Sequence, residues 1–128
     1  MDDTILAERD IARLLAEYCH FIDDGNFAGL LGCFTEDAEF VFAGRVKAGR
    51  AAMLRFFEKT SGPDQRGKHV TANTIVDIDG DRARAASDFV FLVRVGDGLV
   101  PLITGRYSDE ACREGGRWRL TRREVTTL

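Results

Sequence analysis

The sequence predicts an α+β fold in which a cone-shaped, curved antiparallel sheet packs against N-terminal helices. Helical periodicity is confined to the first half of the 128-residue chain, and long segments rich in β-branched residues fill the second half. Three tight turns join those segments, and strands joined by tight turns pair antiparallel. The length suits one domain, and no linker or repeat divides residues 1–128.

The first half of the chain predicts three helices and one strand. Residues 4–23 carry apolar side chains at helical spacing and end before Gly25, a suitable C-terminal residue. Asn26 is a candidate N-cap for a short second helix, and residues 50–60 predict a third. A strand is expected at residues 39–42. The apolar positions of the first helix are Ile11, Leu14, Leu15, Tyr18 and Ile22.

The second half predicts four strands, at residues 68–78, 82–95, 99–113 and 118–127, separated by glycine-containing turns. A strongly curved sheet closed by helices encloses an interior, and an apolar interior with a few polar groups is typical of a small-molecule site. The alternative is that aromatic side chains fill the interior as an ordinary core. The candidate lining residues are Phe40, Phe42, Met53, Phe56, Phe57, Phe89 and Phe91.

Composition argues against several functional classes. The net charge is −3 and no basic stripe occurs, so we expect no nucleic-acid partner. No apolar run reaches 18 residues and the N-terminus is acidic, so we expect neither a membrane segment nor a signal peptide. Three cysteines without a Cys-x-x-Cys pattern favour reduced thiols and a cytoplasmic location.

Two histidines in the whole chain argue against a metal site. The sequence also has no Walker motif and no Gly-x-Gly-x-x-Gly, the glycine patterns that bind nucleotides and dinucleotide cofactors. We therefore expect no metal and no cofactor.

Three polar side chains stand where a role in a pocket is expected. Tyr18 lies on the apolar stripe of the first helix, and a buried phenol needs a partner for its hydroxyl. Asp23 borders the same stripe near the helix C-terminus, where a negative charge is unfavourable. His69 opens the first long strand, and a histidine paired with an acid is a general base near neutral pH. The alternatives are a core tyrosine, an exposed acid and a structural histidine.

Two further candidates depend on strand parity. Either Ser87 and Phe89 or Asp88 and Val90 face the interior, and the sequence leaves both open. Arg122 and Arg123 carry the same ambiguity. An inward arginine would bind a carboxylate, an enolate or a departing hydroxyl, whereas an outward one is solvated.

Several strings resemble the SnoaL-like branch of the nuclear transport factor 2-like superfamily, which includes ketosteroid isomerases, scytalone dehydratase, bile acid 7α-dehydratase and polyketide cyclases. The resemblance implies a single SnoaL-like domain over residues 1–128, the cystatin-like cone fold and a homodimer formed through the sheet. Because the superfamily contains enzymes and binding proteins, it predicts the fold more specifically than the activity. The strings lie at residues 18–26, 33–38, 69–73, 79–83, 105–107 and 116–120.

The resemblance also implies catalytic roles for individual residues. Tyr18, Asp23 and His69 look like the Tyr, Asp and His of the dehydratase members. Asp88 and Arg123 look like a further acid and an arginine, and Arg123 is preferred to Arg122 because the family tends to place arginine five residues after the tryptophan.

The side chains expected to contact substrate include one position where the chain departs from a family pattern. Phe42 stands where ketosteroid isomerases carry their aspartate base, which argues against steroid Δ-isomerisation by that mechanism. The substrate-contacting set is Phe40, Phe42, Met53, Phe57, Asn73 and Phe89.

We therefore expect a cofactor-independent lyase or isomerase acting on an apolar cyclic small molecule that bears a carbonyl, steroid-like or polyketide-like. His69, oriented by Asp23, would remove a proton, and Tyr18 would donate a hydrogen bond to the enolate or the leaving hydroxyl. Arg123, with Asp88, would position the substrate. The alternatives are a polyketide cyclase-like enzyme and a non-catalytic binding or assembly module of the same fold.

Overall fold

Two helices open the fold at the positions that the apolar spacing predicts. In the computed structural model, which describes residues 3–128, α1 spans Asp3–Asp24 and α2 spans Phe27–Gly32. The buried face of α1 contains all five predicted apolar positions together with Ala7 and Cys19. Gly25 has a φ of 70°, and the Asn26 side chain accepts a hydrogen bond of 3.0 Å from the Gly29 backbone N–H. These two residues turn the chain sharply from one helix into the next.

Six strands and a third helix complete the chain. Strand β1 spans Phe34–Phe42 and β2 spans Arg45–Ala48. Helix α3 spans Arg50–Thr60, and a 3₁₀ turn follows at Pro63–Gln65. The remaining strands are β3 (Lys68–Asp79), β4 (Arg82–Val95), β5 (Gly98–Glu114) and β6 (Arg117–Thr127). The sheet order is β2-β1-β6-β5-β4-β3.

The sheet is mixed rather than wholly antiparallel, which corrects the sequence-based expectation. The meander β3–β6 and the pair β1–β2 are antiparallel, as their tight turns require, but β1 pairs in parallel with β6. These two strands are joined by most of the chain, so no tight turn fixes their direction. The sequence also missed β2 and the first half of β1, since β2 is short and exposed and carries only one large apolar residue, Val46.

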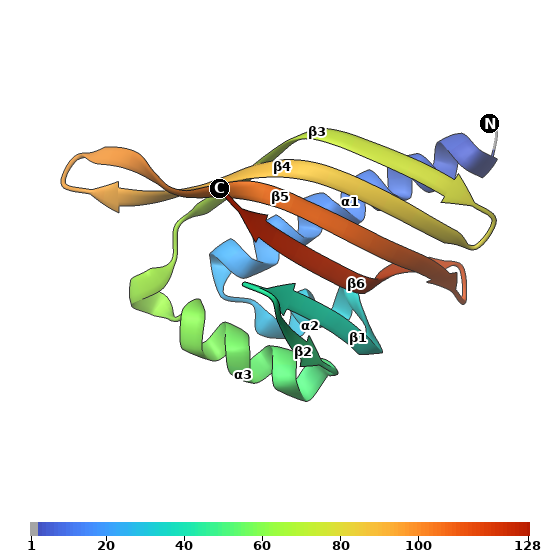
Figure 1. The fold of residues 1–128 in the computed structure, drawn as a ribbon, viewed down its shortest axis with the longest axis horizontal. Coiled ribbons are helices and arrows are strands. Elements are labelled where there is room, and N and C mark those ends of the chain that lie inside the picture. Colours follow the sequence, from blue (N-terminus) through green and yellow to red (C-terminus); the bar gives the residue numbers. More distant parts are fainter. Residues whose placement is uncertain (1–2) are drawn as a thin grey trace.

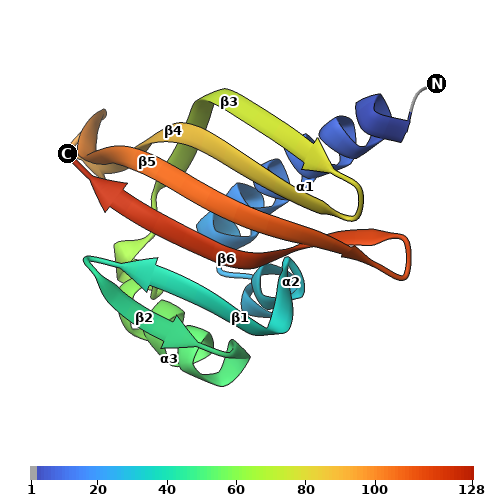
Figure 2. The ribbon, with the colours of Figure 1, turned by 45° about the vertical axis from the view of Figure 1, so that its right-hand side comes forward.

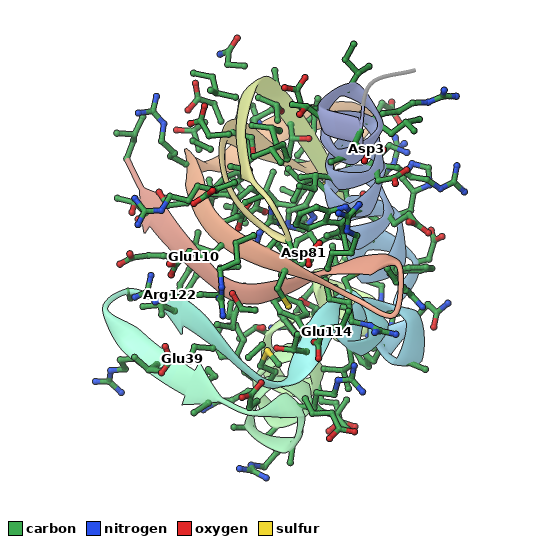
Figure 3. All side chains as sticks on the ribbon, turned by 90° about the vertical axis from the view of Figure 1, so that its right-hand side faces the viewer. Asp3, Glu39, Asp81, Glu110, Glu114 and Arg122 are labelled. Atoms are coloured by element: carbon green, nitrogen blue, oxygen red, sulfur yellow. The ribbon has the colours of Figure 1, made fainter. Side chains whose placement is uncertain are left out.

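The helices cover the concave side of the sheet. Helix α1 runs behind β3 to β6, and α3 lies under β1 and β2 (Figures 1 and 2). Figure 3 shows the sheet from the side, with α1 on one side and the side chains of Glu39, Glu110 and Arg122 pointing away on the other. The interior between these layers is where the buried apolar residues gather. In residues 3–128, no helix combines the length and the apolarity that crossing a membrane requires.

The long strands bend at irregular positions. The β3–β4 register shifts between Ala72 and Ile75, and Asn73 in this bulge has a φ of 56°. A bulge bends its strand and increases the local twist. The bend curves β3 over α1, so the start of β3 comes beside the end of α1 (Figure 1).

Candidate active site

A cavity of about 180 Å³ lies between the concave face of the sheet and the helices. Most of its wall is aromatic, and its polar rim comes from Thr60, Ser61 and Gln65, at and after the end of α3. The six phenylalanines of the wall come from β1, α3 and β4: Phe40, Phe42, Phe56, Phe57, Phe89 and Phe91. The aromatic side chains therefore surround a space rather than filling it.

Asp23 and His69 meet at this cavity. The distance between Asp23 Oδ1 and His69 Nδ1 is 2.6 Å, and the two side chains are only 11% and 14% exposed. The same carboxylate accepts the His69 backbone N–H at 3.0 and 3.1 Å. This bond explains why an acid occupies the end of α1, where the helix dipole alone disfavours it. Sequence reasoning predicted both residues, and the fold brings them together across 46 positions.

The Asp23 contact orients the imidazole. With its proton on Nδ1 and donated to the carboxylate, the neutral ring has a free lone pair on Nε2. Within residues 3–128, no hydrogen-bond partner occupies Nε2. The ring also packs on Phe91, with 4.5 Å between ring centroids, and it lines the cavity. The dyad therefore has the form of a general base facing an apolar space.

Tyr18 lines the same cavity from α1 and is almost completely buried. Burial raises the pKa of its phenol above the ordinary value, and the nearby Arg123 charge opposes this shift only in part. The phenol therefore stays protonated at neutral pH and is available as a hydrogen-bond donor. The structure brings together Tyr18, Asp23 and His69 from the predicted catalytic set.

Arg123 lies behind the cavity wall rather than in it. Its guanidinium carbon is 4.2 Å from the Tyr18 ring centroid and 3.7 Å from that of Tyr107. Asp109 binds the guanidinium through two hydrogen bonds of 2.8 and 2.9 Å, and both side chains are buried. Although burial lowers the pKa of Arg123, the Asp109 carboxylate raises it above its usual value. Of the pair whose orientation the sequence left open, Arg123 is the inward one, and its side chain is bound by Asp109 and supports the two tyrosines.

Asp88 and Asn73 do not reach the cavity, which corrects their predicted placement. Ser87 and Phe89 are the inward pair of β4, so alternation along the strand turns Asp88 to the opposite face. There Asp88 accepts hydrogen bonds from Arg106 (2.7 Å) and from Asn73 (3.0 Å). These two bonds lower the pKa of the Asp88 carboxyl. The contacts belong to the outer surface of the sheet.

Of the other residues predicted to contact substrate, four line the cavity and one lies in the hydrophobic core. Phe40, Phe42, Phe57 and Phe89 line the cavity. Met53 is fully buried but lies one helical turn before Phe57 and packs into the hydrophobic core instead.

Sequence reasoning missed Tyr107 and Asp109. Tyr107 lines the cavity and stacks on Phe89 with 4.4 Å between centroids, and Asp109 binds Arg123. The strand pattern of β5 could have identified Asp109. Alternate positions from residue 103 to 111 point inward, and Asp109 is the only charged residue among them.

Among residues 3–128, no group of three or more His, Cys, Asp or Glu side chains is arranged to hold a metal ion. The polar groups that line the cavity include the His69 imidazole, which Asp23 holds, and the phenol of Tyr18. Their chemistry is proton transfer and hydrogen-bond donation.

The geometry agrees with a comparison against family profiles. The profile described as "SnoaL-like domain" matches residues 3–124. The chain belongs to the SnoaL-like family. A comparison with curated proteins finds no match.

Several solved structures share the fold of this chain. Rv3472 from Mycobacterium tuberculosis, a protein of unknown function, is 31% identical with a TM-score of 0.91, covering 99% of this chain and 75% of its own. A candidate scytalone dehydratase from Novosphingobium aromaticivorans is 26% identical with a TM-score of 0.86, covering 100% and 89%. An NTF2-like protein with a cystatin-like fold from the same organism is 26% identical with a TM-score of 0.83, covering 99% and 90%.

Proposed function

We propose that this SnoaL-like chain is a cofactor-independent acid–base enzyme, of the dehydratase or isomerase type, acting on a small apolar ring compound that bears a carbonyl. The observation that carries the proposal is the 2.6 Å contact between Asp23 and His69 at the wall of a cavity that Tyr18 also lines. The similarity to a candidate scytalone dehydratase supports the dehydratase form.

In the proposed mechanism, His69 Nε2 removes a proton from the carbon next to the substrate carbonyl. Asp23 holds the ring in the required tautomer and stabilises the imidazolium that forms. Tyr18 donates a hydrogen bond to the carbonyl oxygen as it gains enolate charge. The enolate then expels a hydroxyl from the next carbon, which takes the proton held by His69 and leaves as water, so the product is the dehydrated ketone. If His69 instead returns the proton to another carbon, the product is an isomer.

The size of the cavity favours one- or two-ring compounds over a four-ring steroid. Its volume is about 180 Å³. Drug-sized ligands occupy pockets of roughly 300–1,000 Å³, whereas an apolar cavity of roughly 150 Å³ binds benzene. The proposed substrate is therefore a compact cyclic ketone, closer to a polyketide ring than to a steroid.

The test uses 3-hydroxy-1-tetralone, a two-ring β-hydroxyketone that gives fluorescent 1-naphthol when it loses water. We expect the wild-type protein to accelerate this conversion. The His69→Ala and Asp23→Asn variants should each lower kcat by about 10²- to 10⁴-fold, the range that one positioned acid–base group supplies. The matched control is His20→Ala, since His20 is the other histidine and lies exposed on α1.

Two outcomes would overturn the proposal. One is turnover that survives both dyad substitutions. The other is a wild-type protein that binds 1-tetralone in the cavity but converts no β-hydroxyketone. The second outcome would favour the alternative function, a non-catalytic small-molecule-binding module with the same cavity.

A further inference from the structure

A second hollow, which we name the basic groove, lies beside the cavity, where α3 meets the β1–β2 hairpin. Its volume is about 430 Å³. Among the described residues that line it, none is acidic, although the chain as a whole has a net charge of −3. The positive charge is therefore concentrated locally. The four cations of the basic groove are Arg45, Lys47, Arg55 and Lys59.

Two structural periodicities bring these cations together. Arg45 and Lys47 are two positions apart in β2, so both point to the same side of the strand. They pair with β1 residues that line the cavity, which places them on the α3 side of the sheet. Arg55 and Lys59 are four positions apart in α3 and therefore share one helix face. The strand and the helix present their charges to the same space.

Within the described residues 3–128, no carboxylate forms an ion pair with any of the four cations of the basic groove. Lys47 is half-buried, and its ammonium lies 5.4 Å from the Phe56 ring centroid. Unpaired like charges around one hollow create a positive potential, and a bound anion relieves their repulsion.

The basic groove and the cavity lie next to each other. They share Phe42, Phe56 and Thr60 as lining residues. The Phe42 and Phe56 rings lie 5.8 Å apart and form part of the wall of both spaces. A ring compound seated among the phenylalanines would extend a short substituent past these rings toward the four cations.

We propose that the basic groove binds an anionic group, a carboxylate or a phosphate, carried by the same ring compound that occupies the cavity. The inference rests on the proposed function for the identity of the ring, and it adds that the substrate is an acid. The cations act by binding and orienting the substrate, because none of them belongs to the acid–base set.

The test measures binding of two unreactive probes with the same ring system, 2-naphthylacetate and 2-(2-naphthyl)ethanol. We expect the carboxylate to bind more tightly than the alcohol, with a preference that falls as salt is added. The Arg55→Gln/Lys59→Gln double variant should weaken binding of 2-naphthylacetate by about 3- to 10-fold, the range for two exposed charges, and leave binding of the alcohol unchanged. The Phe42 and Phe56 wall stays intact in this variant.

The matched control is the Arg9→Gln/Arg84→Gln double variant, which removes the same charge from the N-terminal half of α1 and from near the β3–β4 turn, away from α3 (Figure 1). We expect it to bind both probes as the wild type does. Equal affinity for the two probes, or an equal loss in the control variant, would overturn the basic groove as an anion site. Failure to bind the neutral alcohol at all would instead count against the cavity and the proposed function.

Discussion

At the scale of single residues, three polar side chains of the candidate site stand out already in the sequence. Tyr18, Asp23 and His69 were each anomalous for their local environment: a phenol on an apolar stripe, an acid at a helix C-terminus and a histidine at the start of a strand. In the fold Tyr18 and His69 line one cavity, and Asp23 binds His69. Such anomalies are informative because a burial cost or an unfavourable charge needs a compensating contact.

The surroundings of two other site candidates, Asp88 and Arg123, depend on strand pairing and could not be predicted from local sequence. Whether Asp88 or Ser87 points inward depends on strand parity, which no local pattern fixes when both neighbours are apolar. Arg123 points inward, and its partner Asp109 lies on the adjacent strand β5, so the β5–β6 register of the whole sheet decides the pairing. Tertiary pairing decides both cases.

The tyrosines allow a prediction about alkaline stability. The chain has two tyrosines, Tyr18 and Tyr107, and burial raises the pKa of both phenols. In the unfolded chain they ionise near pH 10, so the protonated phenols stabilise the fold below that pH. As the pH rises above about 10, the unfolded state loses protons first, and the stability should fall.

The measurement is absorbance at 295 nm beside far-UV circular dichroism between pH 8 and 12. Phenolate absorbance should appear together with the loss of secondary structure and not before it. The Tyr18→Phe variant should show a smaller loss of stability over the same pH range in urea unfolding. A native circular dichroism spectrum with both tyrosines ionised near pH 10 would contradict the prediction.

At the scale of secondary-structure elements, helices and long strands were predictable and the short edge strand was not. The periodicity of α1 and α3 and the turns after β3, β4 and β5 gave bounds close to those observed. Strand β2 has four residues, and its pairing with β1 gives it structure that its own sequence does not predict. The parallel β1–β6 pair follows from tertiary packing.

The contact between β5 and β6 gives a prediction about one element. Gly105 of β5 is buried, and a Cβ there would collide with the carbonyl oxygen of Thr126 in β6 and lie 2.9 Å from Phe89 Cε1. Gly105→Ala should therefore destabilise the fold by about 1–3 kcal/mol, the usual cost of overpacking. Urea unfolding measures the change.

The control for that prediction is Gly32→Ala. The added methyl group at Gly32 meets only the Arg117 side chain, at 3.9 Å. We expect its unfolding free energy to match or slightly exceed that of the wild type, because alanine has the higher helix propensity. Equal stabilities for the two alanine variants would show that β5 and β6 separate at Gly105 without strain.

At the scale of the whole molecule, the sheet has one face covered by helices and one face open (Figure 3). The open face of β3 carries Val70 and Ile75, which are 45% and 65% exposed. Exposed apolar patches mark association sites. We propose that a second copy of the chain covers this face, as the family resemblance implied.

Analytical ultracentrifugation tests this proposal. The wild type is expected to sediment as a dimer, and Ile75→Glu should shift it toward monomer by introducing a charge into the contact. Ile5→Glu is the control, since Ile5 is 54% exposed on α1 and away from the open sheet face. A monomeric wild type, or dissociation by both variants, would contradict the assignment of the interface.

Asp23 binds His69 at both its ring and its backbone N–H, so His69 can act as the proposed base only while α1 stays packed against β3. When the last turn of α1 leaves β3, the carboxylate releases the imidazole and the main-chain N–H in the same event. Local openings of this kind require less free energy than global unfolding. Moderate heating should therefore inactivate the protein reversibly while its sheet stays folded. The temperature at which activity is lost should lie below the temperature at which the protein unfolds.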